Sequence, residues 1–286
     1  MSNIFKTIKN MNGAYLIAEI GINHNGDMNI AKKLIDATNA CGWHCAKFQK
    51  RNPAVCVPED QKSNIRSTPW GKMTYLEYKN KIEFEKEQYD IINQYCLEKP
   101  LPWTVSIWDI DSLNFITEYD IPFIKIPSAH LTNRELLAET AKSNIPVIIS
   151  TGMSTWEIID DAVKILDDHN AEYAILHCNS TYPAPYEELN LNIIPLMKNR
   201  YNCIIGYSGH EYNLEPSVIA ATMGAEIIER HITLDHSMWG TDQKASLEVH
   251  AMDLLRKRID AINGILGVTE KIITESEKSV MKKLRG

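Results

Sequence analysis

The sequence lacks several features that would place it in common protein classes. Its six cysteines form no CxxC pair, which argues against a zinc knuckle or a thioredoxin-like motif and favours reduced thiols. No apolar run is long enough to span a membrane, and the N-terminus lacks the apolar stretch of a signal peptide. We therefore expect a cytoplasmic protein with no membrane partner.

Basic residues are outnumbered by acidic ones. The chain has 30 Lys and Arg against 37 Asp and Glu, a formal net charge of −7. Nucleic acid is therefore excluded as an expected partner, because its binding needs a basic face. An anionic ligand would have to be held by locally placed Lys or Arg, because the net negative charge of the chain repels it. The length of 286 residues and the 44% hydrophobic content allow a sizeable buried core.

Short apolar runs alternate with amphipathic stretches along the whole chain. The strand candidates are Tyr15–Ile20, His44–Phe48, Trp103–Ile107, Phe123–Ile126, Val147–Ser150, Tyr173–His177, Cys203–Tyr207 and Glu226–His231. Helical patterns lie near 29–40, 84–98, 110–118, 132–142, 154–168, 189–199, 214–223 and 247–265. Continuously apolar runs indicate a parallel sheet covered on both faces.

Eight strands, each followed by a helix, predict a single-domain α/β protein with a TIM (β/α)8 barrel over residues 1–266. A doubly wound open sheet is the rival, but no Gly-rich dinucleotide fingerprint follows the first strand. Residues 267–286 are expected to form a charged helical tail. Residues 50–82 form an insertion after the second strand, and a long loop on the catalytic side of a barrel is usually functional.

Polar residues stand at the ends of the predicted strands, where TIM barrels place their active sites. They are Glu19, Lys47, Gln49, Ser106, Lys125, His130, Ser150, His177, Ser180, Tyr182, Ser208, His210, His231 and Asp242. His210 and His231 lie 21 residues apart, about one strand–helix–strand step. In a barrel they would come from adjacent strands at the same end, which suits a divalent metal ion.

The other residues divide by chemistry. Lys47 and Lys125 should be interior, and burying them requires anionic partners. The serines are small hydroxyl donors suited to phosphate or carboxylate oxygens. Glu19 and Asp242 are candidate acid/base or hydroxyl-binding carboxylates. Together they predict a pocket for a small, doubly anionic ligand beside a metal and a polyol.

Each residue also has a structural alternative. His210 and His231 could be ordinary buried histidines that form hydrogen bonds to the backbone. For His177 this structural role is the favoured interpretation. Lys47 could form a structural ion pair with Glu19, and Lys125 could extend to solvent. The serines could be turn residues.

Eight segments of the chain resemble the N-acetylneuraminate (sialic acid) synthase family. They are YLIAEIGINHNG (15–26), AKFQ (46–49), WGKMTYLEYKNKIEF (70–84), IPFIKIPSAHLTN (121–133), VIISTGMS (147–154), LHCNSTYPAPYEEL (176–189), IGYSGHE (205–211) and ERHITLDHSMWGTDQKASLE (229–248). They run in family order over nearly the whole chain. The resemblance implies condensation of phosphoenolpyruvate with an open-chain aldose, which consumes water, releases phosphate and gives a 3-deoxy-2-ulosonic acid.

The resemblance also implies a role for each candidate residue. Lys47, Ser106 and Lys125 would bind the phosphoenolpyruvate carboxylate and phosphate, and Ser150, Ser180 and Ser208 would complete the anion site. His210 and His231 would hold Mn²⁺ or Mg²⁺. Gln49, Tyr182 and Asp242 would meet the sugar hydroxyls, and Glu19 would lie close to metal, water and sugar. The family also implies a possible homodimer.

The sequence departs from the family pattern in two places. Where the family commonly has an acid, in a motif like KIGSGE or KVGSGD, this chain reads KIPSAH, so that His130 stands in its place. A histidine can transfer protons near neutral pH, but the change could also mark a different aldose or a weakened site. The family also usually appends a small antifreeze-like domain that helps to bind the N-acyl group of the sugar. The sequence given ends at Gly286, about where that domain would begin.

Three functions therefore compete. The leading expectation is synthesis of a sialic-acid-like sugar, and the runner-up is the same chemistry on a pentose phosphate or an unacetylated hexose. A phosphorylated sugar would need basic residues at the mouth, which Lys50, Arg51, Lys62, Arg66 and Lys72 could provide, although they could equally solvate a surface loop. A sugar-binding pseudoenzyme is the third, and it is disfavoured because charges buried without a ligand cost stability.

Overall fold

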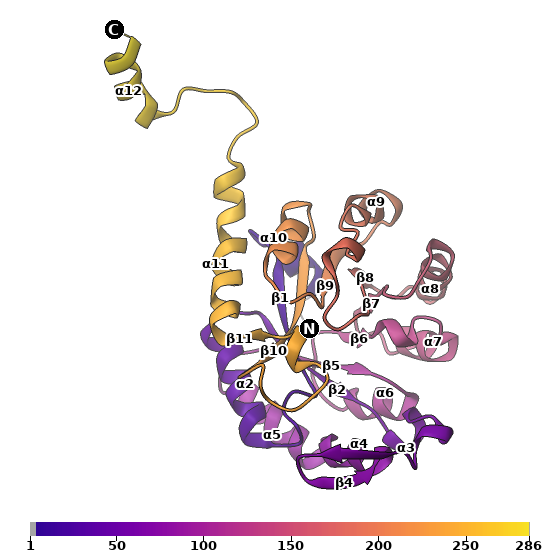
Figure 1. The fold of residues 1–286 in the computed structure, drawn as a ribbon. Coiled ribbons are helices and arrows are strands. Elements are labelled where there is room, and N and C mark those ends of the chain that lie inside the picture. The colour runs from indigo at the N-terminus through magenta and orange to yellow at the C-terminus, as the bar shows by residue number, and fades with distance from the viewer. Residues whose placement is uncertain (1–3, 286) are drawn as a thin grey trace.

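The computed structural model describes residues 4–285, and within them eight parallel strands form a closed barrel (Figure 1). The barrel strands are β1 (Tyr15–Gly21), β2 (Cys45–Lys50), β5 (Trp103–Ile107), β6 (Ile124–Ile126), β7 (Val147–Ser150), β8 (Tyr173–Cys178), β9 (Ile204–Gly209) and β10 (Ile227–Thr233). Each pairs with the next along the chain, and β10 pairs with β1 to close the ring. The predicted TIM barrel is confirmed.

Helices cover the outside of the barrel (Figure 1). They are α2 (Met28–Ala40), α5 (Lys86–Leu97), α6 (Ile110–Ile116), α7 (Arg134–Lys142), α8 (Trp156–Asp168), α9 (Ile193–Arg200), α10 (Glu215–Thr222) and α11 (Val249–Leu266). In α2, the Asp27 side chain caps the first turn by accepting from the Asn29 N–H at 2.7 Å. The same helix buries Ala31, Leu34 and Ile35, at the helical spacing that turns one face to the sheet.

Strand alternation sorts the side chains between the helix layer and the barrel interior. In β1, Leu16, Ala18 and Ile20 join the core cluster that includes the surrounding helices, whereas Tyr15 and Ile17 join a separate interior cluster. Successive side chains of a strand point to opposite faces, so Glu19 continues the interior row. The interior is therefore apolar at the N-terminal ends of the strands and polar at their C-terminal ends.

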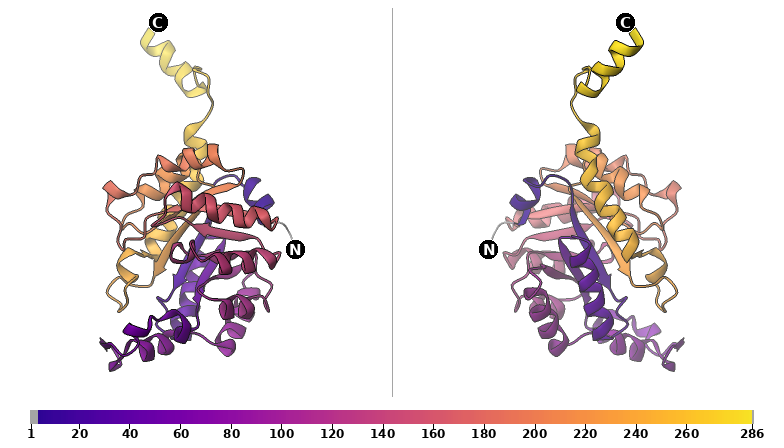
Figure 2. Two further views of the ribbon diagram at one scale, coloured as in Figure 1. Left: turned by 90° about the vertical axis from the view of Figure 1, so that its right-hand side faces the viewer. Right: turned by 90° about the vertical axis from the view of Figure 1, so that its left-hand side faces the viewer.

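A short N-terminal helix, α1 (Ile4–Lys9), seals the apolar end of the barrel. Its Ile4, Phe5 and Ile8 are buried in the interior cluster with residues such as Tyr15 and Phe123. Figure 2 shows α1 on the side of the barrel opposite to the mouth. The sequence did not indicate this helix, because six residues are too few for a periodic pattern. Within residues 4–285, buried apolar side chains therefore close this end of the barrel, and the opening lies at the polar end.

The insertion at residues 50–82 has its own secondary structure. It contains α3 (Pro53–Cys56), an antiparallel hairpin of β3 (Ile65–Thr68) and β4 (Gly71–Thr74), and α4 (Tyr75–Ile82). A capping box begins α4, since Thr74 and Glu77 bond each other's backbone N–H. The rings of Trp70 and Tyr78 contact Trp239 edge-on at centroid distances of 5.8 and 5.1 Å. The insertion thus packs against the loop after β10 at the mouth.

Several strand boundaries differ from the predicted ones by one or two residues. Strand β10 continues two residues beyond His231, because a short ninth strand, β11 (Leu247–Glu248), pairs with Ile232 and Thr233. At the other end, α11 leads into a segment that projects from the barrel and carries α12 (Glu275–Arg285), in which no described side chain is buried (Figures 1 and 2). The domain boundary at 266 stays a prediction. None of the helices within residues 4–285 is both long and apolar enough to cross a membrane.

Candidate functional site

A cavity of about 210 Å³ lies at the polar end of the barrel. Every predicted site residue except His130 and Asp242 lines it, namely Glu19, Lys47, Gln49, Ser106, Lys125, Ser150, Ser180, Tyr182, Ser208, His210 and His231. The lining also includes Trp108, Pro127, Ser128, Ala129, Met153, Cys178 and Glu229, which the strand-end argument did not single out. The barrel therefore brings residues from all eight strands, or the loops that follow them, to one small volume.

Two buried lysines form the cationic part of the cavity. Lys125 donates to Ser150 Oγ at 2.7 Å and lies 3.2 Å from Glu229 Oε1, and Lys47 lies 3.6 Å from Glu229 Oε2. Lys125 is only 3% exposed, so it does not extend to solvent. Burial lowers the pKa of Lys125, and Glu229 offsets only part of that effect. Both ammonium groups therefore stand where an anionic ligand would be drawn in.

Glu229 and Glu19 differ sharply in their tendency to ionise. Burial opposes ionisation of Glu229, but Lys125 and Lys47 outweigh it and hold the pKa of Glu229 well below its usual range. Burial raises the pKa of Glu19, and the charge of Glu229 adds to the increase despite the contact with Lys47. One carboxylate thus neutralises the lysine pair, while the other can carry a proton near neutral pH.

Glu229 is the main residue that sequence reasoning missed. It accepts from Ser208 Oγ at 2.9 Å and sits between the two lysines. The signal was present, since Glu229 and His231 are two residues apart and therefore share the inner face of one strand. Glu229 lies inside its strand rather than at the strand end, where polar residues of a TIM-barrel site are expected.

Close packing at Gly21 holds three site residues together. Gly21 has φ +54°, and a Cβ there would lie 3.0 Å from Glu19 Oε1, 3.1 Å from Gln49 Nε2 and 3.3 Å from His231 Cε1. Only glycine supplies both the left-handed backbone and the space. Gln49 Nε2 in turn donates to Glu19 Oε1 at 3.1 Å.

His210 and His231 meet as their spacing predicts. Their ring centroids are 5.5 Å apart. The Asn179 carbonyl lies 2.6 Å from His210 Nδ1, which places the proton on Nδ1 and a lone pair on Nε2, where the Tyr182 hydroxyl donates at 2.9 Å. His231 Nδ1 is buried and has no hydrogen-bond partner among the described residues. His210 Nε2, which contacts the Tyr182 hydroxyl, and His231 Nδ1, which has no hydrogen-bond partner within residues 4–285, are therefore the ring nitrogens left for a ligand.

The two remaining predicted residues lie outside the lining. Asp242 Oδ2 is 3.9 Å from His231 Nδ1, in the loop beyond β10. His130 is half-buried, and its ring meets the edge of Trp108 at a centroid distance of 5.1 Å. Burial lowers its pKa. His130 contacts Trp108, which lines the cavity, but does not line the cavity itself. A catalytic role for His130 stays a prediction.

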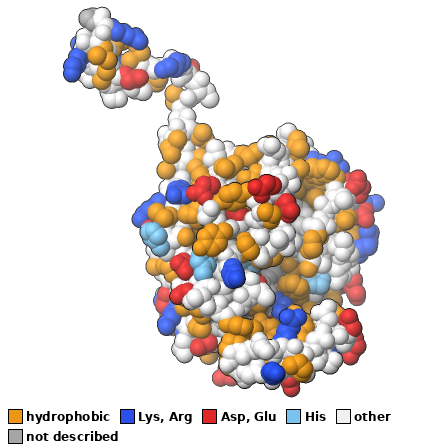
Figure 3. Space-filling model, in the orientation of Figure 1, with side chains coloured by type: hydrophobic (Ala, Val, Ile, Leu, Met, Phe, Trp, Pro, Cys, Tyr) orange, Lys and Arg blue, Asp and Glu red, His pale blue; other side chains and the backbone are white. Residues whose placement is uncertain are grey.

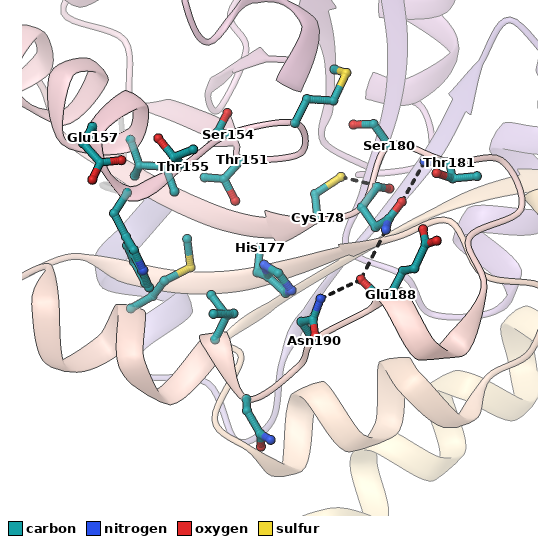
Figure 4. Close-up of a pocket in the computed structure, with 17 residues that line it drawn as sticks. Thr151, Ser154, Thr155, Glu157, His177, Cys178, Ser180, Thr181, Glu188 and Asn190 are labelled. Carbon is teal, nitrogen blue, oxygen red and sulfur yellow. Dashed lines mark hydrogen bonds between the residues drawn. The ribbon is translucent and has the colours of Figure 1, made fainter.

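His177, which the sequence marks as structural, points away from this cavity. Its Nε2 lies 2.7 Å from the Leu189 carbonyl oxygen. It lines a larger cavity of about 900 Å³ between α8, the loop after β8 and α9 (Figure 4). The described lining of that larger cavity contains no Lys or Arg. Despite its size it therefore suits an anionic ligand less well than the smaller cavity does.

A buried ion pair lies directly behind the two histidines. Arg230 Nη1 donates to Glu211 Oε1 at 2.9 Å and to Ser217 Oγ on α10 at 3.0 Å, and both charged side chains are fully buried. Tyr207 OH donates to Glu211 Oε2 at 2.8 Å. Glu211 and Arg230 are the sequence neighbours of His210 and His231. The network therefore ties both histidine backbones to one helix.

Known proteins resemble this chain over most of its length. The sequence profile of the NeuB family matches residues 34–271. The chain is 40% identical to the N-acetylneuraminate-9-phosphate synthase of Drosophila melanogaster over 88% of this chain and 68% of that protein. It is 32% identical to the N,N'-diacetyllegionaminic acid synthase of Campylobacter jejuni over 94% and 82%.

A solved structure gives the same result. The N-acetylneuraminic acid (sialic acid) synthetase of Leptospira borgpetersenii, crystallised with citrate, superposes with a TM-score of 0.84 at 29% identity, covering 96% of this chain and 93% of that one. The resemblance drawn from eight sequence segments is thereby confirmed. The chain belongs to the NeuB family and is a phosphoenolpyruvate-dependent condensing enzyme of the sialic acid synthase type.

Proposed function

We propose that this enzyme joins C3 of phosphoenolpyruvate to the aldehyde carbon of an open-chain N-acyl aldose, such as N-acetylmannosamine or a close relative. Water adds at C2 and phosphate leaves, which gives a 3-deoxy-2-ulosonic acid. One observation carries the proposal. Two buried lysines and two buried histidines line a single cavity of about 210 Å³. The names of the relatives support a sialic-acid-like product.

Lys47 and Lys125 bind phosphoenolpyruvate as an anion. The hydroxyls of Ser106, Ser150, Ser180 and Ser208 line the same cavity and donate to its phosphate and carboxylate oxygens. Fixed cations and donors hold C3 in line for attack, and such positioning supplies much of the rate. Glu229 keeps the lysines compensated when the site is empty.

The residues present fit a divalent metal ion. The unpartnered Nδ1 of buried His231 and the Nε2 of His210 are the protein ligands that would hold it. No cluster of three or more His, Cys, Asp or Glu suited to a metal occurs within residues 4–285, so the other positions fall to water and substrate oxygens. A bound Mn²⁺ or Mg²⁺ would supply Lewis-acid polarisation of the aldehyde oxygen.

The aldose lies above phosphoenolpyruvate, toward the mouth. Gln49 and Tyr182 line the upper cavity, and Asp242 stands just beyond His231. These side chains offer both donors and acceptors to the sugar hydroxyls. Glu19 contacts Lys47 and Gln49, and its raised pKa lets it give or take the proton of the added water.

The experiment that tests this function is phosphate release from phosphoenolpyruvate with Mn²⁺ against a panel of aldoses. The panel includes N-acetylmannosamine, mannose, arabinose and their phosphates. We expect release that requires one aldose, stops with EDTA and falls by at least about 10³-fold in His231→Ala, because loss of charge stabilisation at the reacting oxygen costs several kcal/mol.

His250→Ala is the matched control, since His250 is an exposed histidine on α11. It should release phosphate as the unaltered enzyme does. Mn²⁺ binding, followed by electron paramagnetic resonance, should be lost in His231→Ala and kept in His250→Ala. Tight phosphoenolpyruvate binding without release for any aldose would contradict the synthase and favour a sugar-binding pseudoenzyme.

A further inference from the structure

Three cations of the insertion gather at the mouth of the barrel. Arg51 follows β2, Arg66 lies in β3 and Lys79 lies in α4. The Arg66 guanidinium lies 4.2 Å from the centroid of the Tyr75 ring, and the Lys79 ammonium lies 5.3 Å from the same centroid. These three residues are called the lid cluster below. Arg51 is 7% exposed and does not solvate a surface, so that sequence-based alternative does not hold for it.

Lys79 is a buried cation without a counterion. It is only 9% exposed, and within residues 4–285 its ammonium has no hydrogen-bond or ion-pair partner. Its remaining contacts are the rings of Tyr75 and Tyr78, each 5.3 Å from Nζ. Burial, with the charges of Arg51 and Arg66, lowers the pKa of Lys79 to about 8. Holding an unpaired ammonium here costs stability, and an anionic ligand would remove that cost.

Negative charge near the lid cluster is insufficient to balance it. Glu83 and Asp242 are the carboxylates that act on Lys79. Glu83 accepts from the Arg51 backbone N–H at 3.0 Å, lies 3.4 Å from Lys50 Nζ and lies 3.8 Å from Arg51 Nε, so its single charge is shared between Lys50 and Arg51. The Nε of Arg51 is buried and has no hydrogen-bond partner in the described chain. The lid cluster therefore keeps two groups, the Lys79 ammonium and Arg51 Nε, that have no hydrogen-bond partner among residues 4–285.

The lid cluster is connected to the candidate active site at two points. The Arg51 guanidinium donates to Gln49 Oε1, and Gln49 in turn donates to Glu19. Asp242, which influences both Tyr78 and Lys79 electrostatically, is 3.9 Å from His231. Figure 3 shows Lys and Arg side chains beside a hollow in this face, on the side of the insertion. The cluster thus stands beyond the residues proposed to bind the sugar hydroxyls.

We propose that Arg51, Arg66 and Lys79 bind a phosphate group carried by the aldose at the end remote from its aldehyde. This inference rests on the proposed function, which places the aldehyde at the histidine pair and the hydroxyls at Gln49 and Asp242. A chain of that orientation directs its last carbon toward the insertion. Three cations with few compensating carboxylates match a dianionic phosphomonoester, and the arginine donors suit its oxygens.

The test compares kcat/KM for N-acetylmannosamine 6-phosphate and N-acetylmannosamine. We expect the unaltered enzyme to prefer the phosphorylated sugar by about 100-fold, since each charge-assisted hydrogen bond contributes about 1.5–3 kcal/mol. Lys79→Met should lower this preference ratio by about 30-fold, mainly through KM for the sugar phosphate rather than for phosphoenolpyruvate. Lys79→Arg should retain most of the preference.

Lys81→Met is the matched control, because it removes an exposed ammonium from the same helix, where Lys81 lies over Trp70. Its preference ratio should equal that of the unaltered enzyme. Equal kcat/KM for both sugars, or a Lys79→Met effect shared by both, would overturn the lid-cluster site while leaving the synthase intact. If no aldose supports phosphate release, the proposed function fails instead. Calorimetric binding of mannose 6-phosphate against mannose then decides the site, which stands only if Lys79→Met weakens the former alone.

Discussion

At the scale of single residues, His24 shows how a buried imidazole couples the fold to pH. Its ring stacks on Phe84 at a centroid distance of 3.9 Å, and its Nδ1 accepts from the Gly26 N–H at 3.0 Å. Burial lowers the pKa of His24 from 6.5 to about 3. A proton on Nδ1 would also remove the acceptor that Gly26 uses. The folded chain therefore holds this ring neutral.

The stability that His24 contributes should fall in acid. Below pH 6.5 the unfolded chain gains a proton at His24 that the folded chain takes up only near pH 3, so stability is lost as pH falls through this window. The loss from this residue is about 2 kcal/mol between pH 7 and pH 5. Urea unfolding at the two pH values measures it. His24→Gln, whose amide can still accept a hydrogen bond, should lose about 2 kcal/mol less than the unaltered chain.

His250 provides the matched control for His24. The variant His250→Gln, at an exposed position, should keep the full pH dependence of stability seen in the unaltered chain. An equal pH dependence in His24→Gln and the unaltered chain would show that His24 titrates freely in the folded state.

At the scale of elements, the Glu211–Arg230 pair joins β9, β10 and α10 behind the histidines. Arg230→Met leaves Glu211 as an uncompensated buried charge, and we expect a loss of about 3–5 kcal/mol in the free energy of unfolding. Tyr207→Phe removes one hydrogen bond to Glu211 and should cost about 1–2 kcal/mol. Because the pair flanks His210 and His231, both variants should also bind Mn²⁺ more weakly. Urea unfolding and paramagnetic resonance measure the two effects.

Arg258→Met is the control for this prediction. Arg258 pairs with Glu215 at 3.4 Å on the surface of the same helix layer, and an exposed pair contributes less than about 1 kcal/mol. A small effect of Arg230→Met, comparable to that of Arg258→Met, would show that the buried pair does not hold the two strands.

Elements also show what the sequence could and could not predict. All eight barrel strands were predicted, because each is a continuous apolar run and a clear helical pattern separates it from the next. Glu229 was missed because it interrupts the apolar run of a buried strand. Only the strand register shows that its side chain faces the cavity. The lid cluster was only partly anticipated. Arg51 and Arg66 were candidates, but Lys79 sits in an amphipathic helix where its exposure depends on packing against the loop that carries Trp239.

At the scale of the whole molecule, the two ends of the chain contribute unequally. Deletion of residues 267–286 should change the melting temperature by less than about 1 °C, since no described side chain of α12 is buried. Phe5→Ala, at the other end, should cost about 3 kcal/mol, because Phe5 fills the barrel floor. Calorimetry of both variants makes the comparison. A loss of several degrees on deletion would contradict the proposed boundary at residue 266.

The sealed floor of the barrel has a kinetic consequence. Within residues 4–285, α1 and the apolar interior close one end of the barrel, so substrates and products share the opening at the polar end. If phosphoenolpyruvate lies deepest, as proposed, an aldose that arrives early blocks its route. The enzyme must then bind its substrates in a fixed order, phosphoenolpyruvate before sugar. Excess sugar should inhibit the reaction by blocking the entry of phosphoenolpyruvate.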